Sequence, residues 1–284
     1  MLGLLAQYEE SGFAGLIETL ARTPIDRVVI FALVCTLIRV GIWRYLMGLA
    51  PHIRKQGGPR FAAFFQEVCD ALIYAGIVVF LLIRPYVIQT FKIPSESMVP
   101  TLLVGDLLIV NKAVYRYSEP QPGDIVVFKP PQIAKEPGQG DVDFVKRLVG
   151  TPGQVIEIRD KQLYRDGIPS KEEYLNKDLP VQFQAEDFKL VRYNGEIIPI
   201  VRDDEGRTLH RSINDTVVAP QDREMVWNLN PEPIPANHYL MIGDNRDGSF
   251  DGRFWGLIDR RAIVGKAWVR FWPPNRMGGA DVRK

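Results

Sequence analysis

The segment Phe91-Lys-Ile-Pro-Ser-Glu-Ser-Met-Val-Pro-Thr-Leu-Leu-Val-Gly-Asp106 divides the chain into two parts of different character. Long apolar runs precede it, and short strand-like runs separated by turns follow it. Pro94 and Pro100 hold φ at about −65° and push the residues before them toward extended geometry. We therefore predict a stiff, non-helical segment that cannot be a central strand. Its hydroxyls, Ser95 and Ser97, belong either to a simple turn after a membrane helix or to a site that holds a nucleophile.

The composition excludes several classes of protein. The 284 residues suffice for one large domain or two smaller ones. Basic and acidic residues nearly balance, at 35 and 34, so we expect no nucleic-acid partner. The only cysteines, Cys35 and Cys69, lie in the apolar N-terminal third, so the rest of the chain has no disulfide. The histidines are far apart and no metal-binding motif occurs, so we expect neither a metal nor another cofactor.

Two apolar runs lie before the dividing segment. Residues 28–43 are apolar except at two positions, one of them Arg39, and residues 71–83 are apolar throughout. A transmembrane helix needs about 20 mostly apolar residues, so these runs are either buried core helices or membrane spans. We favour transmembrane helices over 28–48 and 67–89. Arg39 is then tolerable if it lies about one turn from the helix end and its charge reaches the interface.

The loop between the two runs, residues 49–66, sets the expected orientation. It carries a cluster of basic residues: Arg54, Lys55 and Arg60. Because cytoplasmic loops are rich in Lys and Arg, we place this loop in the cytoplasm. The N-terminal segment 1–27 and everything after about residue 90 are then extracytoplasmic. A cleaved secretory signal is not expected, because the first strong apolar run begins only at Val28.

After residue 90 the sequence predicts a mainly β protein. Short runs rich in Val, Ile and aromatics alternate with Pro, Gly and Asp turns, at 107–114, 124–129, 144–149, 154–159 and 262–271. We expect an antiparallel β-sheet catalytic domain, a sandwich or a coiled barrel, built from residues 90–154 and 236–274. Residues 155–235 are more polar and contain hairpin-like turns at 166–167, 194–195 and 203–206, so we interpret them as an inserted β lobe. Residues 275–284 form a loose tail.

One lysine in the run 144–149 is surrounded by apolar residues. Strand alternation places Lys146 on the same face as Phe144 and Leu148. If that face is buried, desolvation lowers the pKa of the ammonium group. A neutral lysine can act as a general base that activates a serine. The alternative is a lysine whose stem lies along the core while its amine reaches water.

The stretch GDNRDGSFDGRFWG, residues 243–256, combines three aspartates and two arginines with several glycines. Alternating Asp and Asn would suit calcium, but arginines interrupt the pattern and the final Glu of an EF-hand loop is missing. We favour a loop cross-braced by Asp–Arg pairs, which offers Ser249 as a positioned hydroxyl.

Four ordered motifs resemble bacterial signal peptidase I: Pro-Ser95-x-Ser97-Met98-x-Pro100-Thr, Gly-Asp-Ile-Val-Val-Phe at 123–128, Lys146-Arg-Leu-Val-Gly-x-Pro-Gly153 and Gly-Asp-Asn-Arg-Asp-x-Ser249. The resemblance covers about 91–154 and 236–270 and is loose over 155–235. It implies a membrane-bound peptidase of the Ser-Lys dyad type that removes signal peptides from exported pre-proteins, cleaving after small residues (A-x-A-like). The implied location is the bacterial inner membrane, with the catalytic domain on the periplasmic side. The implied partners are signal peptides, the lipid bilayer and the protein-export channel.

The resemblance also implies a role for each matching catalytic residue. Ser97 matches the nucleophile, and Lys146 matches the general base. Ser95 matches the hydroxyl that joins the Ser97 backbone N–H in the oxyanion hole, and Ser249 matches the hydroxyl that orients the lysine amine. Two supporting positions also match: Asp251 and Arg253.

The family's substrate-pocket positions fall on mostly apolar residues of this chain: Phe91, Ile93, Pro94, Leu102, Leu108, Val127, Asp143 and Val145. The chain departs from the family pattern at Glu96, where many relatives have glycine, and at Gly248 before Ser249.

Two other functions remain open at this stage. One is a related Ser-Lys peptidase that matures a single dedicated partner in secretion or conjugation. The other is an inactive membrane-tethered scaffold. Self-cleaving repressors share the dyad, but the two N-terminal apolar runs argue against the DNA-binding head that they carry.

Overall fold

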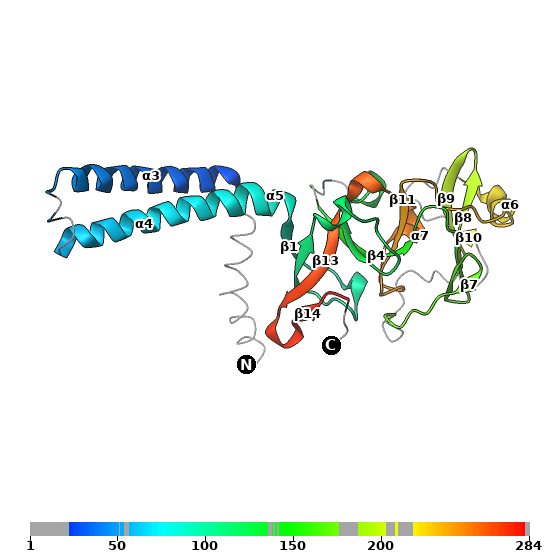
Figure 1. Ribbon diagram of the computed structural model, residues 1–284. Coiled ribbons are helices and arrows are strands. Elements are labelled where there is room, and N and C mark those ends of the chain that lie inside the picture. Colours follow the sequence, from blue (N-terminus) through cyan, green and yellow to red (C-terminus); the bar gives the residue numbers. More distant parts are fainter. Residues whose placement is uncertain are drawn as a thin grey trace. The chain divides into compact units, whose positions relative to one another are not determined.

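The computed structural model describes residues 23–50, 52–53, 57–135, 138, 140, 142–175, 187–202, 208–209 and 218–281 (Figure 1). The chain forms two compact units, Met1–Thr90 and Phe91–Lys284. The boundary coincides with the start of the segment 91–106, where the sequence changes character.

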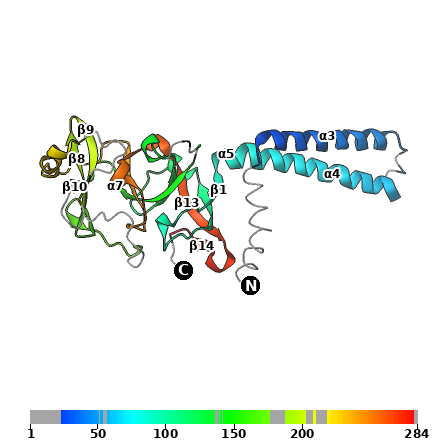
Figure 2. The ribbon, with the colours of Figure 1, turned by 180° about the vertical axis from the view of Figure 1, so that it is seen from behind.

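The first unit is built on two long helices that run side by side in both views (Figures 1 and 2). Helix α3 spans Ile25–Met47, and α4 spans Gly57–Ile77 before a π-helical turn at Val78–Ile83 and the short α5, Arg84–Tyr86. Because Pro59 is tolerated in the first helical turn, α4 begins at Gly57 rather than near residue 67. The connection is therefore shorter than the expected 49–66. Arg54 and Lys55 lie outside the described residues.

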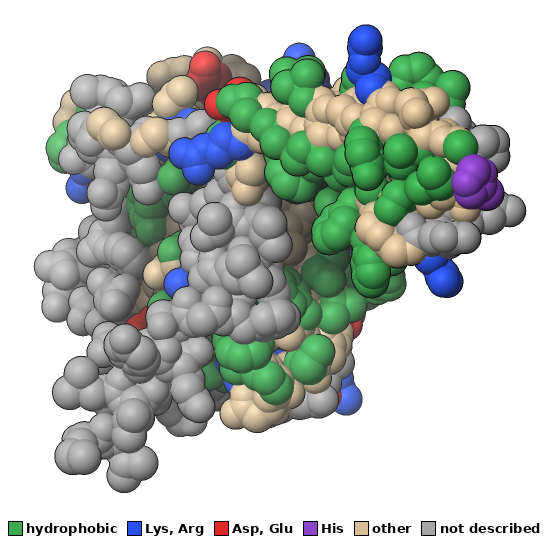
Figure 3. Space-filling view, turned by 90° about the vertical axis from the view of Figure 1, so that its left-hand side faces the viewer, with side chains coloured by type: hydrophobic (Ala, Val, Ile, Leu, Met, Phe, Trp, Pro, Cys, Tyr) green, Lys and Arg blue, Asp and Glu red, His purple; other side chains and the backbone are tan. Residues whose placement is uncertain are grey.

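Both helices are long and apolar enough to cross a membrane, over Asp26–Met47 and Gly57–Leu81. Their apolar side chains are largely exposed, with Leu37 at 72% and Phe61 at 70%. Hydrophobic side chains likewise cover much of the helical surface in Figure 3. A helix that is apolar all round and remains uncovered requires an apolar environment. The two helices are thus candidate membrane spans.

The contact between α3 and α4 carries a charge pair that the sequence analysis did not anticipate. Arg39 Nε forms an ion pair with Asp70 Oδ1. Arg39 lies about two turns from the end of α3, so the condition that it lies about one turn from the helix end is not met. Pairing lowers the cost of a charge in the hydrocarbon layer. Cys35 and Cys69 are free thiols, and both are buried.

Apart from β1, which spans the boundary, the strands of a large sheet belong to the second unit. Their order is β1 (Ile88–Lys92), β2 (Leu107–Asn111), β13 (Ile263–Trp272), β3 (Ile125–Phe128), β4 (Phe144–Gly150), β11 (His238–Ile242) and β12 (Ile258–Asp259), with β14 (Gly278–Gly279) also on β13. The pairs from β2 to β12 are antiparallel. Register shifts in β13 mark bulges, which bend a strand and let the sheet curve. The mainly β, antiparallel fold is confirmed.

Strand β2 ends earlier than the apolar run 107–114 predicted. The Asn111 side-chain oxygen accepts hydrogen bonds from the backbone N–H groups of Ala113 and Val114, at 2.9 and 3.0 Å. The N–H groups of Ala113 and Val114 thus bond to this side chain instead of to a neighbouring strand of the sheet. The chain turns into a 3-10 helix at Val114–Arg116.

Six strands form a second sheet, in the order β10 (Thr208–Leu209), β9 (Glu196–Arg202), β8 (Asp187–Tyr193), β5 (Ile156–Arg159), β6 (Gln162–Arg165) and β7 (Ile168–Pro169). The predicted turns at 166–167 and 194–195 have both central residues at positive φ, as type I′ hairpins require. A third such turn, Asp160-Lys161, carries no glycine and so gave no signal. The turn predicted at 203–206 lies outside the described residues.

The two sheets share one hydrophobic core rather than packing separately. Val149 of β4 and Ile242 of β11 cluster with Leu163 and Phe188 of the second sheet. Phe254, from the short helix α7 (Gly252–Trp255), joins the same cluster. The lobe is therefore fixed to the sheet that carries Lys146.

Candidate active site

Ser97 lies in a single turn of 3-10 helix, Glu96–Met98. The Val99 N–H donates to the Glu96 carbonyl at 3.0 Å and closes this turn. The prediction of a wholly non-helical segment is thus wrong for these three residues, although Ser95 before them is extended, with φ −138° and ψ 162°. Met98 is 1% exposed and anchors the turn in an apolar cluster. A buried anchor next to Ser97 fixes where its hydroxyl points.

Lys146 meets Ser97 directly. Its Nζ donates to Ser97 Oγ at 2.5 Å. The residue is 5% exposed, and its amine lies 5.9 Å from the centre of the Phe144 ring. Lys146 is thus buried, which is the condition on which a neutral amine depends, and the alternative in which the amine reaches water does not apply.

Burial lowers the pKa of Lys146 to about 8. The negative charges of Asp251 and Asp244 act in the opposite direction, whereas Arg253 lowers this pKa further. Desolvation outweighs these charges, so a useful fraction of the amine is neutral in mildly alkaline solution.

The other two hydroxyls implied by the resemblance occupy different settings. Ser95 Oγ lies 3.3 Å from Ser97 Oγ, so their two-residue spacing does bring them to one side. Ser249 is fully buried, and its Oγ has no hydrogen-bond partner among the described residues. It makes no hydrogen bond to the Lys146 amine, which its implied orienting role would require. A Cβ added to Gly243 would nevertheless lie 2.3 Å from Ser249 Oγ and 2.5 Å from Ser97 O, which places Ser249 beside the nucleophile.

Within the loop 243–253, Asp251 and Arg253 brace one another. Arg253 Nε donates to Asp251 Oδ1 at 2.9 Å, and the Gly243 N–H donates to Asp251 Oδ2 at 2.9 Å. Asp251 also caps α7 by accepting from the Arg253 N–H. Both side chains are buried. The bond from the Gly243 N–H to Asp251 ties the beginning of the loop to its end.

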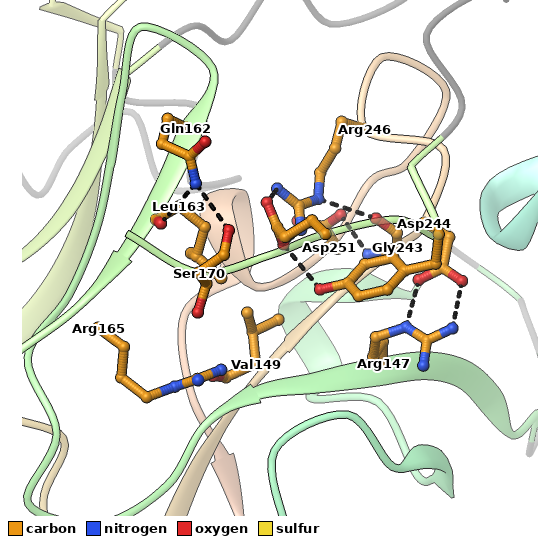
Figure 4. Close-up of polar contacts among 12 residues, drawn as sticks. Arg147, Val149, Gln162, Leu163, Arg165, Ser170, Gly243, Asp244, Arg246 and Asp251 are labelled. Carbon is orange, nitrogen blue, oxygen red and sulfur yellow. Dashed lines mark hydrogen bonds and ion pairs between the residues drawn. The ribbon is translucent and has the colours of Figure 1, made fainter. Parts of the chain in front are cut away.

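Two further charges of this loop, Asp244 and Arg246, pair with residues outside it, in addition to the expected Asp–Arg bracing within the loop. Arg147 donates to Asp244 through two parallel bonds of 2.7 and 2.6 Å (Figure 4). Thr101 Oγ1 donates to the same carboxylate at 2.6 Å. Arg246 pairs with Glu172 of the lobe. Among the described residues, no group of three or more His, Cys, Asp and Glu side chains could hold a metal ion.

Asn245 is a contact residue that the sequence analysis missed. Its backbone N–H donates to the Ser97 carbonyl at 3.1 Å, and its Nδ2 donates to the Glu96 carbonyl at 3.2 Å. The turn that carries Ser97 is therefore attached to loop 243–253 by its backbone. The Glu96 side chain is exposed.

The predicted pocket residues separate into three groups. Ile93, Leu102 and Leu108 are buried in one cluster with Met98, and Val145 packs against it. Val127 is fully buried and pairs with Val145 across the β3–β4 ladder. The other three lie at the margin, with Phe91 half-buried, Pro94 exposed and Asp143 Oδ1 at 3.6 Å from Lys129 Nζ.

Comparisons with known proteins agree on one family. The model of the family described as "Signal peptidase, peptidase S26" matches residues 65–272. Signal peptidase I of Leptolyngbya laminosa is 34% identical over 231 residues, which cover 78% of this chain and 91% of that protein. Signal peptidase I of Aquifex aeolicus is 34% identical over 213 residues, which cover 69% and 80%. A solved signal peptidase I from Enterococcus faecalis is 20% identical, with a TM-score of 0.30 over 52% of this chain and 97% of that chain, too low to establish a shared fold.

Proposed function

Because the chain belongs to the signal peptidase family, peptidase S26, we propose that Ser97 and Lys146 form its catalytic dyad. The protein is a serine endopeptidase that removes signal peptides from pre-proteins. One observation carries the assignment of the dyad: a buried amine with a lowered pKa lies 2.5 Å from a serine hydroxyl, close enough to accept its proton when the amine is neutral. This is the arrangement that an activated serine requires.

The reaction follows from this geometry. Neutral Lys146 accepts the Ser97 proton while Oγ attacks the scissile carbonyl carbon, and the resulting ammonium then protonates the departing amine. The Ser97 N–H and the Ser95 hydroxyl stabilise the negatively charged oxygen of the tetrahedral intermediate. Water, deprotonated by Lys146, hydrolyses the acyl-enzyme ester and frees Ser97. Asp251 and Arg253, whose charges act on Lys146, brace loop 243–253, and Ser249 lies buried in the same loop.

The substrate is an exported pre-protein whose signal helix stays in the bilayer while the segment after it lies extended along the site. Apolar pocket residues beside Ser97 favour small side chains at the cleavage point, as in an A-x-A-like motif. Support for this specificity comes from the Ile93, Leu102 and Leu108 cluster. The emerging pre-protein brings the export channel close to the enzyme as a transient partner.

The substrate assignment is tested with the detergent-solubilised protein and a model pre-protein that ends its signal in Ala-x-Ala. We expect one cut directly after the last alanine, identified by N-terminal sequencing of the product. Changing that alanine to phenylalanine is expected to lower kcat/KM at least 100-fold, because a large ring does not fit a pocket for small residues. Cleavage of the phenylalanine variant at an equal rate would refute the specificity. A panel of unrelated pre-proteins separates a general enzyme from a dedicated one.

We place the β unit on the periplasmic side of the inner membrane. The basic residues between the two candidate spans support this orientation through the positive-inside rule. Protease added outside intact spheroplasts is expected to degrade the β unit. In a separate experiment, a cysteine introduced at residue 55 is expected to stay unlabelled by a membrane-impermeant thiol reagent until the spheroplasts are lysed. Labelling of that loop without lysis would reverse the assignment.

A further inference from the structure

A short segment of the lobe contacts loop 243–253, the loop that is hydrogen-bonded to the Ser97 carbonyl. It follows β7 and comprises residues 170–175. Glu172 and Tyr174 are partly buried, whereas Lys171 and Glu173 between and beside them are exposed. The alternation shows that one side of the segment packs inward.

Glu172 and Tyr174 contact two arginines. Glu172 accepts hydrogen bonds from Arg246 Nη1, at 3.3 Å, and from Nη2, and its side chain is only 4% exposed. The Tyr174 hydroxyl donates to Glu172 Oε1 at 2.7 Å. The Tyr174 ring lies over the Arg147 guanidinium, whose carbon is 4.0 Å from the ring centre. Both contacts are specific in geometry. The Glu172 carboxylate binds the edge of one guanidinium, that of Arg246, and the Tyr174 ring stacks on the face of the other, that of Arg147.

Each arginine in turn holds the start of loop 243–253. Arg246 Nε donates to the Gly243 carbonyl at 3.1 Å, and Arg147 binds the Asp244 carboxylate through two bonds. Figure 4 shows Arg147 and Arg246 converging on this part of the loop. The next residue, Asn245, donates its N–H to the Ser97 carbonyl. An unbroken series of contacts therefore runs from the lobe to the backbone of the nucleophile.

The charges in this series balance, with two arginines against two carboxylates in a largely buried setting. A buried arginine that loses the carboxylate to which it is hydrogen-bonded is strongly disfavoured. Without the Glu172 charge, Arg246 is driven toward solvent and its bond to the Gly243 carbonyl is weakened. Loop 243–253 then loses a support at Gly243. This residue lies directly beside Ser249 and the Ser97 carbonyl, since there is no room between them for even a Cβ on Gly243.

We propose that Glu172 and Tyr174 are positioning residues, through which the inserted lobe fixes loop 243–253 and so the distance between Ser97 and Lys146. The proposal gives the lobe a part in catalysis and rests on the proposed Ser97–Lys146 dyad. Small misplacements of reacting groups lower the rate steeply. The effect therefore falls on kcat, because neither residue is expected to touch the substrate.

The test compares Glu172→Gln with its exposed neighbour, Glu173→Gln, in the full-length protein. We expect Glu172→Gln to lower kcat about tenfold with KM changed less than twofold, and Glu173→Gln to leave both unchanged. Tyr174→Phe keeps the ring over Arg147 and is expected to lose less activity than Tyr174→Leu. In an Arg246→Gln background, Glu172→Gln is expected to have no further effect on kcat, since it acts through that arginine.

A second measurement does not depend on catalysis. In the Ser97→Ala background, hydrogen exchange of the peptide covering 243–253 is expected to speed up with Glu172→Gln and not with Glu173→Gln. Unchanged exchange, an unchanged kcat, or equal losses in the two variants would overturn the proposal. So would a lower Tm without any change in kcat well below that Tm. If instead the Ser97→Ala protein stays active, the dyad fails, and the exchange comparison still decides whether Glu172 positions the loop.

Discussion

Ser97→Ala is expected to lower kcat by on the order of 10⁴- to 10⁶-fold, and Lys146→Ala by a similar factor. The first change removes the attacking oxygen. The second removes the proton acceptor 2.5 Å from that oxygen and leaves no other base in hydrogen-bond contact with it among the described residues. Because nucleophile and base act as one unit, the double variant is expected to be no less active than either single variant.

The measurement is cleavage of the Ala-x-Ala pre-protein by purified variants in detergent, with near-UV circular dichroism to establish that each one is folded. Matched controls come from exposed residues of the same types: Ser118→Ala and Lys171→Ala. Both controls are expected to keep wild-type kcat. Full activity in either dyad variant would show that the assignment of the dyad is wrong.

The rate is expected to fall about tenfold for each pH unit below pH 8, and so about 100-fold from the plateau to pH 6. The reason is the lowered pKa of Lys146, about 8, caused by its burial. Only the neutral amine accepts the Ser97 proton, so protonation on the acid side removes the active form. A lysine with an ordinary pKa near 10.4 would place this limb more than two units higher.

The profile of kcat/KM against pH reports the free enzyme and is the profile to measure. A rate that stays flat from pH 6 to 9 would contradict the role of Lys146 as base. The same pKa shift has a second, independent consequence for stability. Between about pH 8 and 10.4 the folded protein binds fewer protons than the unfolded chain, so the free energy of unfolding rises with pH across that window.

Local patterns predicted those parts of the structure that depend on neighbours in sequence. Alternation along β4 put Lys146 on the same face as Phe144 and Leu148, and the packing of the elements then decided that this face is buried. Glycine after Asp166 and Asn194 identified two hairpins, because both central residues need positive φ. Asn111 ended β2 early through a side-chain contact that no apolar pattern contains.

The parts that escaped prediction are contacts between segments far apart in the chain. Nothing near Glu172 indicates that its partner is Arg246, and nothing near Asn245 indicates that it binds the turn carrying Ser97. Arg39 was considered only against its own helix, so its pair on the neighbouring helix, Asp70, was missed. Long-range pairing of charges is decided by how the elements pack, which spacing in one segment does not encode.

The placement of the thiols sets how this protein can be handled and probed. Both cysteines are in the helical unit, and no residue after Cys69 is a cysteine. The β unit therefore has no covalent cross-link to form or to lose, and its folding is indifferent to reductants. A single cysteine introduced at an exposed position such as Glu173 would be the sole thiol of that unit and could carry a spectroscopic label within the segment 170–175 that supports loop 243–253.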